Sequence, residues 1–363
     1  MTNVMRIADA RHFCGARDKG IIRDVKGILG CQSIEEMHSI FKQRTGDAAR
    51  EANMIHIENL VKRYGDLVAL DHFNLDIREG EVFGLLGPNG SGKTTAINCL
   101  LALLKYDKGT VTVFGEEMHP DSYDLKRQIG VVPQNVAVFE QMTVWENIDY
   151  FCGLYVKDKM ERKRLTEEAI AFVGLEDYRK MFPRKLSGGL LRRLNIACGI
   201  AHQPRLIIMD EPTVAVDPQS RNRILEGILE LNKKGATIIY TSHYMEEVEQ
   251  ICSRIMIMDH GRSIAAGTSE ELKRMIKTGE TIIIEGIVLT EAQLKEIAEL
   301  PHVFATDYNE ERTLKVKCTS AKHNLVRLLN YLQEQEVAFG RVLSEMPTLN
   351  DVFLEITGKE LRD

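Results

Sequence analysis

Residues 87–95 read Gly-Pro-Asn-Gly-Ser-Gly-Lys-Thr-Thr, and this stretch decides the fold of the chain. The spacing G-x-x-x-x-G-K-[ST] is typical of a loop whose backbone N–H groups surround nucleotide phosphates. Glycines let the backbone turn tightly and approach an anion without an intervening Cβ atom. Lys93 would add positive charge for the β- and γ-phosphates, and the Thr94 hydroxyl is a suitable ligand for Mg²⁺. We therefore expect a nucleotide to contact Gly87, Pro88, Asn89, Gly90, Ser91, Gly92, Lys93, Thr94 and Thr95.

The flanks of this loop favour a strand before it and a helix after it. Residues 82–86 form a short apolar run suited to a buried strand, and residues 95–104 predict a helix whose N-terminus faces the phosphates. From residue 54 to about residue 270, short apolar runs alternate with helical patterns, which predicts an α/β fold. Further strands are expected at 129–133, 206–209, 237–240 and 255–258, and helices at 220–233 and 245–252.

Three segments follow from the changes of pattern along the chain. Residues 1–53 show little periodicity apart from a possible short helix at 34–41, and we interpret them as an overlong start or a disordered arm before Met54, with a functional extension as the alternative. Residues 54–274 form the α/β domain. Residues 275–363 predict strands and helices in the order β-α-β-β-α-β, followed by a closing helix, which is a small α+β module.

Composition limits the classes of protein to which this chain can belong. Its 363 residues are 44% hydrophobic and 28% charged, as in an ordinary globular protein, and a net charge of −6 gives no reason to expect a nucleic-acid partner. The seven cysteines show no C-x-x-C pair, which favours reduced thiols over disulfides or a zinc site. No apolar stretch approaches the ~18 residues of a membrane span. We therefore expect a soluble chain that reaches a membrane only through a partner.

Two further motifs carry chemistry. Residues 206–211 place Asp210 and Glu211 at the end of an apolar strand, where a Mg²⁺-binding aspartate and a water-activating glutamate belong in a P-loop ATPase. Ser187, Gly188 and Gly189 precede a helical pattern and would offer a hydroxyl and free N–H groups to an anion. Alone, the serine and glycines would be a flexible helix start; the order of all the motifs favours the anion site.

That order resembles the ATP-binding cassette (ABC) ATPases over residues 54–270. Residues 87–95 resemble the Walker A loop of that family, Gln134 its Q-loop glutamine, residues 186–189 its signature and residues 206–211 its Walker B strand. Asp217 is similar to the D-loop aspartate and His243 to the switch histidine, while Tyr64 stands where the family stacks an aromatic ring on adenine, although it could be an ordinary packing residue.

The resemblance implies a role for each of these residues. Lys93 would neutralise phosphate charge, while Thr94, Asp210 and Gln134 would hold Mg²⁺ directly or through water. Glu211 would polarise the attacking water and His243 would contact the γ-phosphate. The cofactors would be ATP and Mg²⁺, and the fold a RecA-like subdomain plus a helical subdomain at about residues 136–195. Leu190 replaces the usual signature glutamine and residues 214–217 vary the usual D-loop, so we expect altered rates with hydrolysis retained.

The family signature closes over the nucleotide of a second cassette, so the resemblance also implies a homo- or heterodimer with two composite sites. Two classes of function remain open. The first is the ATPase subunit of a membrane transporter, bound to a separate permease at the cytoplasmic face of the membrane. The second is a soluble ABC protein acting in translation or nucleic-acid maintenance. One uninterrupted cassette favours the transporter, with the aromatic residues of 134–139 and 142–147 as a possible docking surface in which Trp145 could instead be core. Residues 192–193, 216–219, 242–246 and 347–353 resemble bacterial ABC-2-type exporters of drugs and antibiotics.

Overall fold

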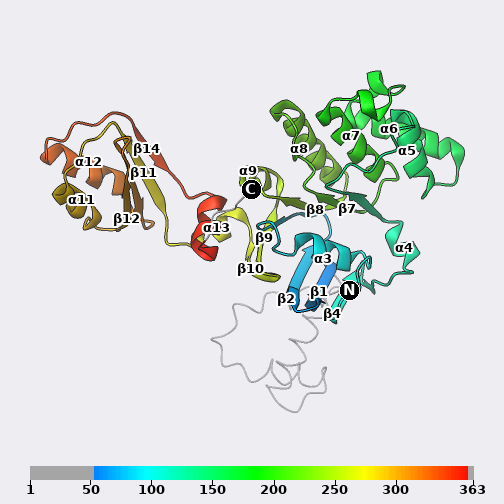
Figure 1. The fold of residues 1–363 in the computed structure, drawn as a ribbon, viewed down its shortest axis with the longest axis horizontal. Coiled ribbons are helices and arrows are strands. Elements are labelled where there is room, and N and C mark those ends of the chain that lie inside the picture. Colours follow the sequence, from blue (N-terminus) through cyan, green and yellow to red (C-terminus); the bar gives the residue numbers. More distant parts are fainter. Residues whose placement is uncertain (1–52, 359–363) are drawn as a thin grey trace, which may run out of the picture. The chain divides into compact units, whose positions relative to one another are not determined.

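The computed structural model describes residues 53–358. Apart from Asn53, which begins the first strand, the segment 1–53 and its expected helix at 34–41 lie outside the described residues. The main domain contains two sheets, one antiparallel and one mostly parallel, and helices that pack on them (Figure 1). None of the helices between residues 53 and 358 is long and apolar enough to cross a bilayer.

The antiparallel sheet has the order β2-β1-β4-β5. Its strands are β1 (Asn53–Tyr64), β2 (Leu67–Arg78), β4 (Lys108–Val113) and β5 (Glu116–Glu117). The alternating pattern at the start of β1 is confirmed, since Ile55 and Ile57 are buried and His56 between them is half-buried. Strands β2 and β4 pair with β1 on either side.

The second sheet has the order β10-β9-β3-β8-β7-β6, and every neighbouring pair in it is parallel except β9 with β10. Its strands are β3 (Val82–Leu86), β6 (Ile129–Val132), β7 (Leu206–Asp210), β8 (Thr237–Ser242), β9 (Arg254–Asp259) and β10 (Arg262–Gly267). The four apolar runs expected as strands form β6, β7, β8 and β9. Both faces of a parallel sheet are covered, which is why these runs are continuously hydrophobic rather than alternating.

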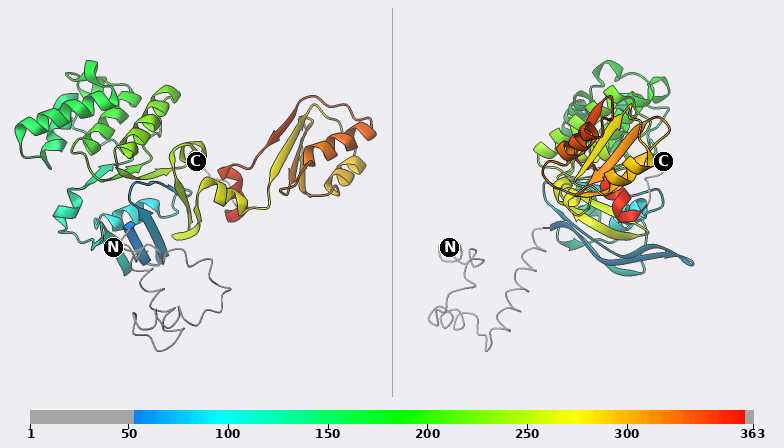
Figure 2. Two further views of the ribbon diagram at one scale, coloured as in Figure 1. Left: turned by 180° about the vertical axis from the view of Figure 1, so that it is seen from behind. Right: turned by 90° about the vertical axis from the view of Figure 1, so that its left-hand side faces the viewer.

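Helices join and cover these strands. They are α3 (Lys93–Leu100), α4 (Tyr123–Lys126), α5 (Val144–Gly153), α6 (Lys159–Val173), α7 (Gly188–Ile200), α8 (Pro218–Lys233), α9 (Met245–Ile251) and α10 (Ser269–Arg274). Short 3₁₀ turns lie at Glu176–Tyr178 and Pro183–Lys185. Helices α5, α6 and α7 pack against one another and form the helical subdomain (Figures 1 and 2).

The helix after the phosphate loop differs from its predicted limits of 95–104. It begins two residues earlier, because Gly92 adopts a left-handed φ of 105° and the helix starts directly from it. It ends at Leu100, because Ala102 has a φ of 50° and the N–H groups of Leu103 and Leu104 both return to the carbonyl of Asn98. The apolar run beyond Leu100 therefore closes the helix rather than extending it.

The C-terminal segment contains a sheet of order β12-β13-β11-β14, antiparallel throughout, with two helices on one face (Figures 1 and 2). Its elements are β11 (Glu280–Glu285), α11 (Glu291–Ala298), β12 (Val303–Tyr308), β13 (Thr313–Cys318), α12 (Asn324–Glu334) and β14 (Val342–Glu345). The β-α-β-β-α-β prediction agrees with this order. The module has its own hydrophobic core, to which Ile282, Ile284, Val316 and Leu328 belong.

The last helix, α13 (Leu349–Thr357), packs elsewhere. Its buried residues Leu349, Val352 and Phe353 belong to the hydrophobic core of the main domain and not to that of the C-terminal sheet. A side chain of α13 also caps the chain after α10, because the Glu355 carboxylate accepts the N–H groups of Lys277 and Thr278. The chain therefore leaves the main domain at α10, forms the C-terminal sheet and returns.

Candidate functional site

The site lies at one edge of the parallel sheet, where the carboxyl ends of four strands meet. The register pairs Leu86 of β3 with Ser242 of β8, Asp210 of β7 with Thr241 of β8, and Val132 of β6 with Met209 of β7. Each of these strands ends immediately before a predicted site segment. The topology therefore gathers the phosphate loop, Gln134, the two carboxylates and His243 in one place, although they are far apart in the sequence.

The phosphate loop has the geometry of an anion site. A Cβ atom on Gly92 would lie 2.7 Å from the carbonyl oxygen of Ala69, and the left-handed φ of Gly92 also disfavours other residues. The ammonium of Lys93 is buried and donates to the carbonyls of Gly87 and Pro88, at 2.7 and 3.2 Å. The Ser91 hydroxyl is also buried, and no group between residues 53 and 358 pairs with it. A bound phosphate would offer acceptors to both side chains.

The charges around Lys93 fit this role. Burial lowers the pKa of the Lys93 ammonium, while the nearby carboxylates of Glu211 and Asp210 act in the opposite direction. A buried cation that is only partly neutralised attracts an anion strongly. The loop is therefore electrostatically suited to a polyphosphate.

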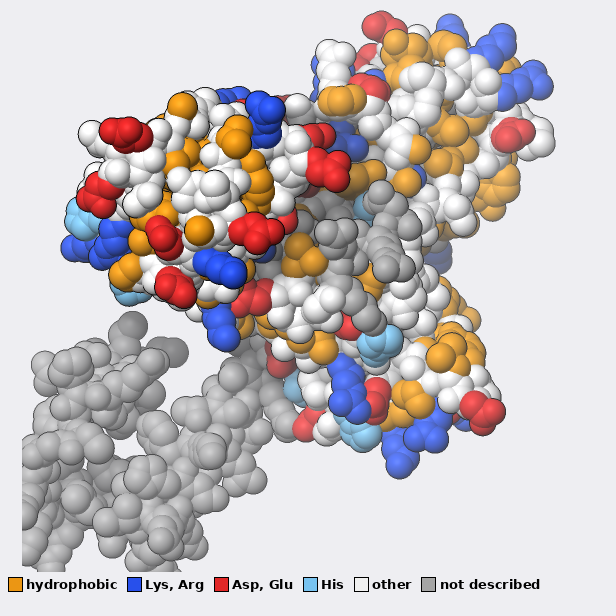
Figure 3. Space-filling view, turned by 60° about the vertical axis from the view of Figure 1, so that its left-hand side comes forward, with side chains coloured by type: hydrophobic (Ala, Val, Ile, Leu, Met, Phe, Trp, Pro, Cys, Tyr) orange, Lys and Arg blue, Asp and Glu red, His pale blue; other side chains and the backbone are white. Residues whose placement is uncertain are grey.

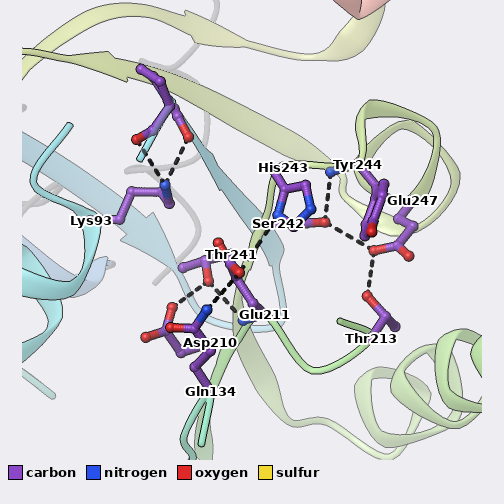
Figure 4. A network of polar contacts seen from close by, with 12 residues as sticks. Lys93, Gln134, Asp210, Glu211, Thr213, Thr241, Ser242, His243, Tyr244 and Glu247 are labelled. Carbon is purple, nitrogen blue, oxygen red and sulfur yellow. Dashed lines mark hydrogen bonds and ion pairs between the residues drawn. The ribbon is translucent and has the colours of Figure 1, made fainter. Parts of the chain in front are cut away.

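Asp210 is held by two hydroxyls. Thr241 Oγ1 donates to one of its oxygens at 2.6 Å (Figure 4), and Thr94 Oγ1 lies 3.4 Å from the other. Thr241 Oγ1 also accepts the N–H of Glu211 at 3.0 Å, so this one hydroxyl orients both acidic residues. The sequence analysis did not identify Thr241; its position two residues before His243, in Thr-Ser-His, is the only local signal.

Glu211 contacts two other residues of the predicted site, Gln134 and His243. Gln134 Nε2 donates to Glu211 Oε2 at 3.0 Å, and His243 Nδ1 lies 3.5 Å from the same oxygen. The glutamate is buried and has a left-handed φ of 47°, a backbone conformation that costs a non-glycine residue about 1–3 kcal/mol. Such strain persists only where the surrounding structure fixes the backbone. In this conformation the Glu211 carboxylate lies within reach of Gln134 and His243.

Helix α7, which begins at the predicted signature, contacts the loop that carries Gln134. Arg192 on α7 donates to the carbonyls of Pro133 and Gln134, at 3.3 and 2.7 Å. Asn195, one turn further along the helix, donates to Pro133 and accepts the N–H of Ala137. The sequence analysis noted Arg192 only as a mark of the exporters, and Asn195 carried no signal. These contacts connect the helical subdomain to the Gln134 loop.

Ser187 and Gly189, predicted as signature residues, lie beside Asp217. Ser187 caps α7 by accepting the N–H of Leu190, and Asp217 caps α8 by accepting the N–H of Ser220. A Cβ atom on Gly189 would lie 2.6 Å from Ser220 Oγ and 3.1 Å from Asp217 Oδ2, so the two helix starts pack directly together. Between residues 53 and 358, no hydrogen bond or ion pair links this pair of helix starts to the phosphate loop.

Tyr64 does not join the other site residues through any hydrogen bond in the described part of the chain. It is 49% exposed at the end of β1, and Lys62 Nζ lies 5.2 Å from its ring centroid. Trp145, which the sequence left open between docking surface and core, is half-buried and donates to Glu167 at 2.9 Å.

A phosphate loop after β3, followed by paired acids at the end of β7 and a histidine after β8, defines a P-loop ATPase. Comparison with known proteins specifies the family. Residues 70–214 match the ABC transporter family, and residues 267–357 match the C-terminal domain of ATP-binding proteins of the DrrA1-3 type. The chain belongs to the ABC transporter family, as one of its ATP-binding, ATP-hydrolysing subunits.

Its relatives match it over most of their length. The linearmycin resistance ATP-binding protein LnrL of Bacillus subtilis is 40% identical over 316 residues, which are 85% of this chain and 100% of that protein. The daunorubicin resistance ATP-binding protein DrrA3 of Streptomyces coeruleorubidus is 34% identical, over 85% of this chain and 97% of its own. A Nod factor export ATP-binding protein of Sinorhizobium fredii is also 34% identical, over 85% of this chain and 87% of its own.

Solved structures agree on the fold of the main domain. An ATP-binding subunit of an ABC transporter superposes with a TM-score of 0.57 at 26% identity, covering 61% of this chain and 92% of its own. A dimeric ATP-binding cassette in a post-hydrolysis state, bound to ADP and Pi, superposes with a TM-score of 0.55 at 28% identity, covering 59% of this chain and 98% of its own. The predicted α/β cassette fold and the predicted ATPase activity are thereby confirmed.

Proposed function

We propose that this subunit powers a separate integral-membrane permease that exports a drug, an antibiotic or a similar compound, and that it works at the cytoplasmic face of the membrane. The observation that carries the proposal is the match over the whole length of a linearmycin resistance ATP-binding protein. The C-terminal module supports the same subfamily, because it matches the C-terminal domain of the DrrA1-3 type. The cargo would bind the permease, so this chain does not specify it.

A role with nucleic acid has little support. Acidic and basic side chains are interspersed on the face drawn in Figure 3, and the net charge is −6. Proteins that hold a nucleic acid backbone gather Lys and Arg on one face. We therefore favour the transporter over a soluble ABC protein of translation or nucleic-acid maintenance.

The permease would dock on the helical subdomain. An open groove of about 510 Å³ lies along α5 and is lined by Met142, Trp145, Tyr150 and Leu154 among others. Phe139 packs on Tyr150 and Phe151 beside this groove, with ring centroids 5.0 and 5.8 Å apart. Phe139 and Tyr150 are each about 40% exposed, so together with Leu154 they place apolar surface next to one another along this groove, as a docking site requires.

Within one protomer, we assign the catalytic roles as the family resemblance implies. Lys93 would bind the β- and γ-phosphates, Glu211 would accept a proton from the attacking water, and His243 would hold the γ-phosphate in line. Mg²⁺ would be held by Thr94, Asp210 and Gln134 and would neutralise charge on the phosphate oxygens.

We propose further that two cassettes, of this chain or of this chain and another, close head to tail on two ATP molecules. Ser187 is exposed at the start of α7, where its hydroxyl and the N–H groups of Gly188 and Gly189 would meet the partner's nucleotide. Asp217 would sit at the same junction. Tyr64, which is exposed, would stack on the adenine of its own site. For the domains we keep 54–274 as the cassette, with its helical subdomain at about 136–195, and 275–363 as a module whose last helix packs on the cassette.

The proposed function is tested by coexpression with a candidate permease, a membrane protein of about six helices from a neighbouring gene. Copurification in detergent, and ATP hydrolysis that a transported compound stimulates, would support it. Copurification with ribosomes or DNA, and with no membrane protein, would contradict it.

The role of Glu211 is tested by Glu211→Gln. The amide keeps the size of the side chain but has no basic oxygen, so hydrolysis should fall by about 10²–10⁴-fold while ATP still binds. Steady-state phosphate release measures the rate, and size-exclusion chromatography with ATP measures dimerisation, which should increase. Unchanged hydrolysis in this variant would remove Glu211 from the catalytic role.

A further inference from the structure

Glu247, in the first turn of α9, provides a second buried carboxylate beside that of Glu211. Its Oε2 atom accepts hydrogen bonds from Thr213 and Ser242, at 2.8 and 3.0 Å (Figure 4), and from the hydroxyl of Tyr240 at 2.6 Å. Its Oε1 atom lies 3.2 Å from Nε of Arg221, an ion pair without the geometry of a hydrogen bond. The side chain of Glu247 is only 4% exposed, and a carboxylate is tolerated at such a position only when it is well paired.

The partners of Glu247 hold both sides of the switch histidine. Ser242 directly precedes His243, and its hydroxyl donates to Glu247 while it accepts the N–H of Tyr244 at 3.0 Å. The guanidinium of Arg221 covers the ring of Tyr244, 4.6 Å from its centroid. The turn that presents His243 is thus tied to Glu247 at its beginning and, through Arg221, at its end.

The same carboxylate holds the loop between Glu211 and Asp217. Thr213 lies in this loop and is fully buried. On its two sides, Glu211 and Ala215 have left-handed φ values of 47° and 59°, a strained conformation for residues other than glycine. The hydrogen bond from Thr213 to Glu247 restrains the loop between these two strained residues.

We propose that Glu247 is a positioning residue for ATP hydrolysis, whose carboxylate ties the turn that carries His243 to the loop that carries Glu211 and Asp217. In this arrangement the loop moves when the partner cassette docks on Asp217. The buried carboxylate of Glu247 passes this movement to the turn that carries His243. Between residues 53 and 358, Glu247 makes no hydrogen bond or ion pair with the phosphate loop, so it acts through its partners. The inference rests on the proposed roles of Glu211 and His243.

The first test is Glu247→Gln, which keeps the shape of the side chain but turns an N–H₂ group toward either Arg221 or the three hydroxyls. Because a small misplacement of a catalytic group can cost about 100-fold, we expect kcat to fall by about 10–100-fold. The KM for ATP should change by less than about threefold, because the phosphate loop is untouched. An unchanged kcat would overturn the proposal.

The matched control is Glu249→Gln on the same helix. Glu249 contacts Ser269 and Lys273 instead of the groups around His243, and this variant should keep kcat within about twofold. If Glu247→Gln does not fold, Thr213→Val serves in its place, because it removes one hydroxyl donor and adds no buried charge. It should lower kcat by about 3–10-fold, and a wild-type kcat in this folded variant would likewise overturn the proposal.

The second test separates positioning from general damage. Single-turnover hydrolysis is measured for the wild type, for Glu247→Gln, for His243→Ala and for the double variant. If Glu247 acts through His243, adding Glu247→Gln to His243→Ala should slow hydrolysis by less than about twofold. Fully additive losses would overturn the proposal.

The variants His243→Ala and Glu247→Gln together distinguish failure of this proposal from failure of the catalytic roles given under the proposed function. An inactive His243→Ala with a fully active Glu247→Gln would leave the role of His243 intact and remove only that of Glu247. Wild-type hydrolysis in His243→Ala would remove the proposed role of His243, and the role of Glu247 with it.

Discussion

The helix α13 should be a structural part of the cassette, although it is the last element of the chain. Phe353 on α13 is 1% exposed and belongs to the same hydrophobic cluster as Val248 and Ile251 of α9 and Leu272 of α10. The variant Phe353→Ala would leave a cavity among these side chains. Because Phe353 is buried in the core of the cassette, we expect this variant to destabilise the cassette and not only the C-terminal module.

The expected size of the effect follows from the burial of the ring. Replacing a fully buried phenylalanine by alanine costs about 3–5 kcal/mol of unfolding free energy. The matched control is Phe304→Ala on β12, where the ring is 43% exposed. That change should cost roughly 0.5 kcal/mol or less.

The chain contains its own probe for this measurement. Trp145 is the single tryptophan, and it lies half-buried on α5 of the cassette. Its fluorescence during urea unfolding therefore reports on the cassette and not on the C-terminal sheet. Nucleotide must be left out, because a ligand at 100 times its Kd adds about 2.7 kcal/mol to every variant. If Phe353→Ala shifts the Trp145 transition by less than about 1 kcal/mol, α13 does not contribute to the cassette core.

Two further predictions concern the junction of Gly189 with Ser220 and the response to pH. Gly189→Ala places a methyl group 2.6 Å from Ser220 Oγ, so hydrolysis should fall by at least about tenfold. The affinity of the isolated monomer for nucleotide should not change, because in the proposed dimer Gly189 faces the nucleotide of the partner. In the control Gly227→Ala the methyl group would meet Phe172 at an ordinary 3.4 Å, so this variant should hydrolyse normally. Phosphate release measures the rate, and equilibrium binding to the monomer measures the affinity. Burial lowers the pKa of His202 to about 4, so the unfolded chain binds the extra proton between about pH 6.5 and pH 4, and stability should be lost as the pH falls through that window, on the order of 2 kcal/mol. Urea unfolding at pH 7 and pH 4.5 measures this loss, which His202→Gln should reduce; an equal loss in that variant would contradict the assignment.

Much of the site could be predicted because its signals are local. The phosphate loop needs glycines and a lysine at fixed spacing, and Asp210 and Glu211 need only follow an apolar strand. The strands of the parallel sheet were predictable for the same reason, since each is a continuous hydrophobic run. The antiparallel strands β2 and β4 were not among the predictions, because they are recognisable mainly by their pairing with β1.

The sequence by itself determined the nucleotide loop, because the backbone conformation over a few residues depends on those residues. It also determined the order of the motifs, and that order determined the family. Only the tertiary structure decided which groups Thr241, Arg192 and Glu247 contact, because their partners are brought to them by the sheet and helices. Arg192 reaches Gln134 across 58 positions of the sequence, and α13 returns to the cassette from beyond a separate module. Contacts of this range have no local pattern, since they exist only after the chain has folded.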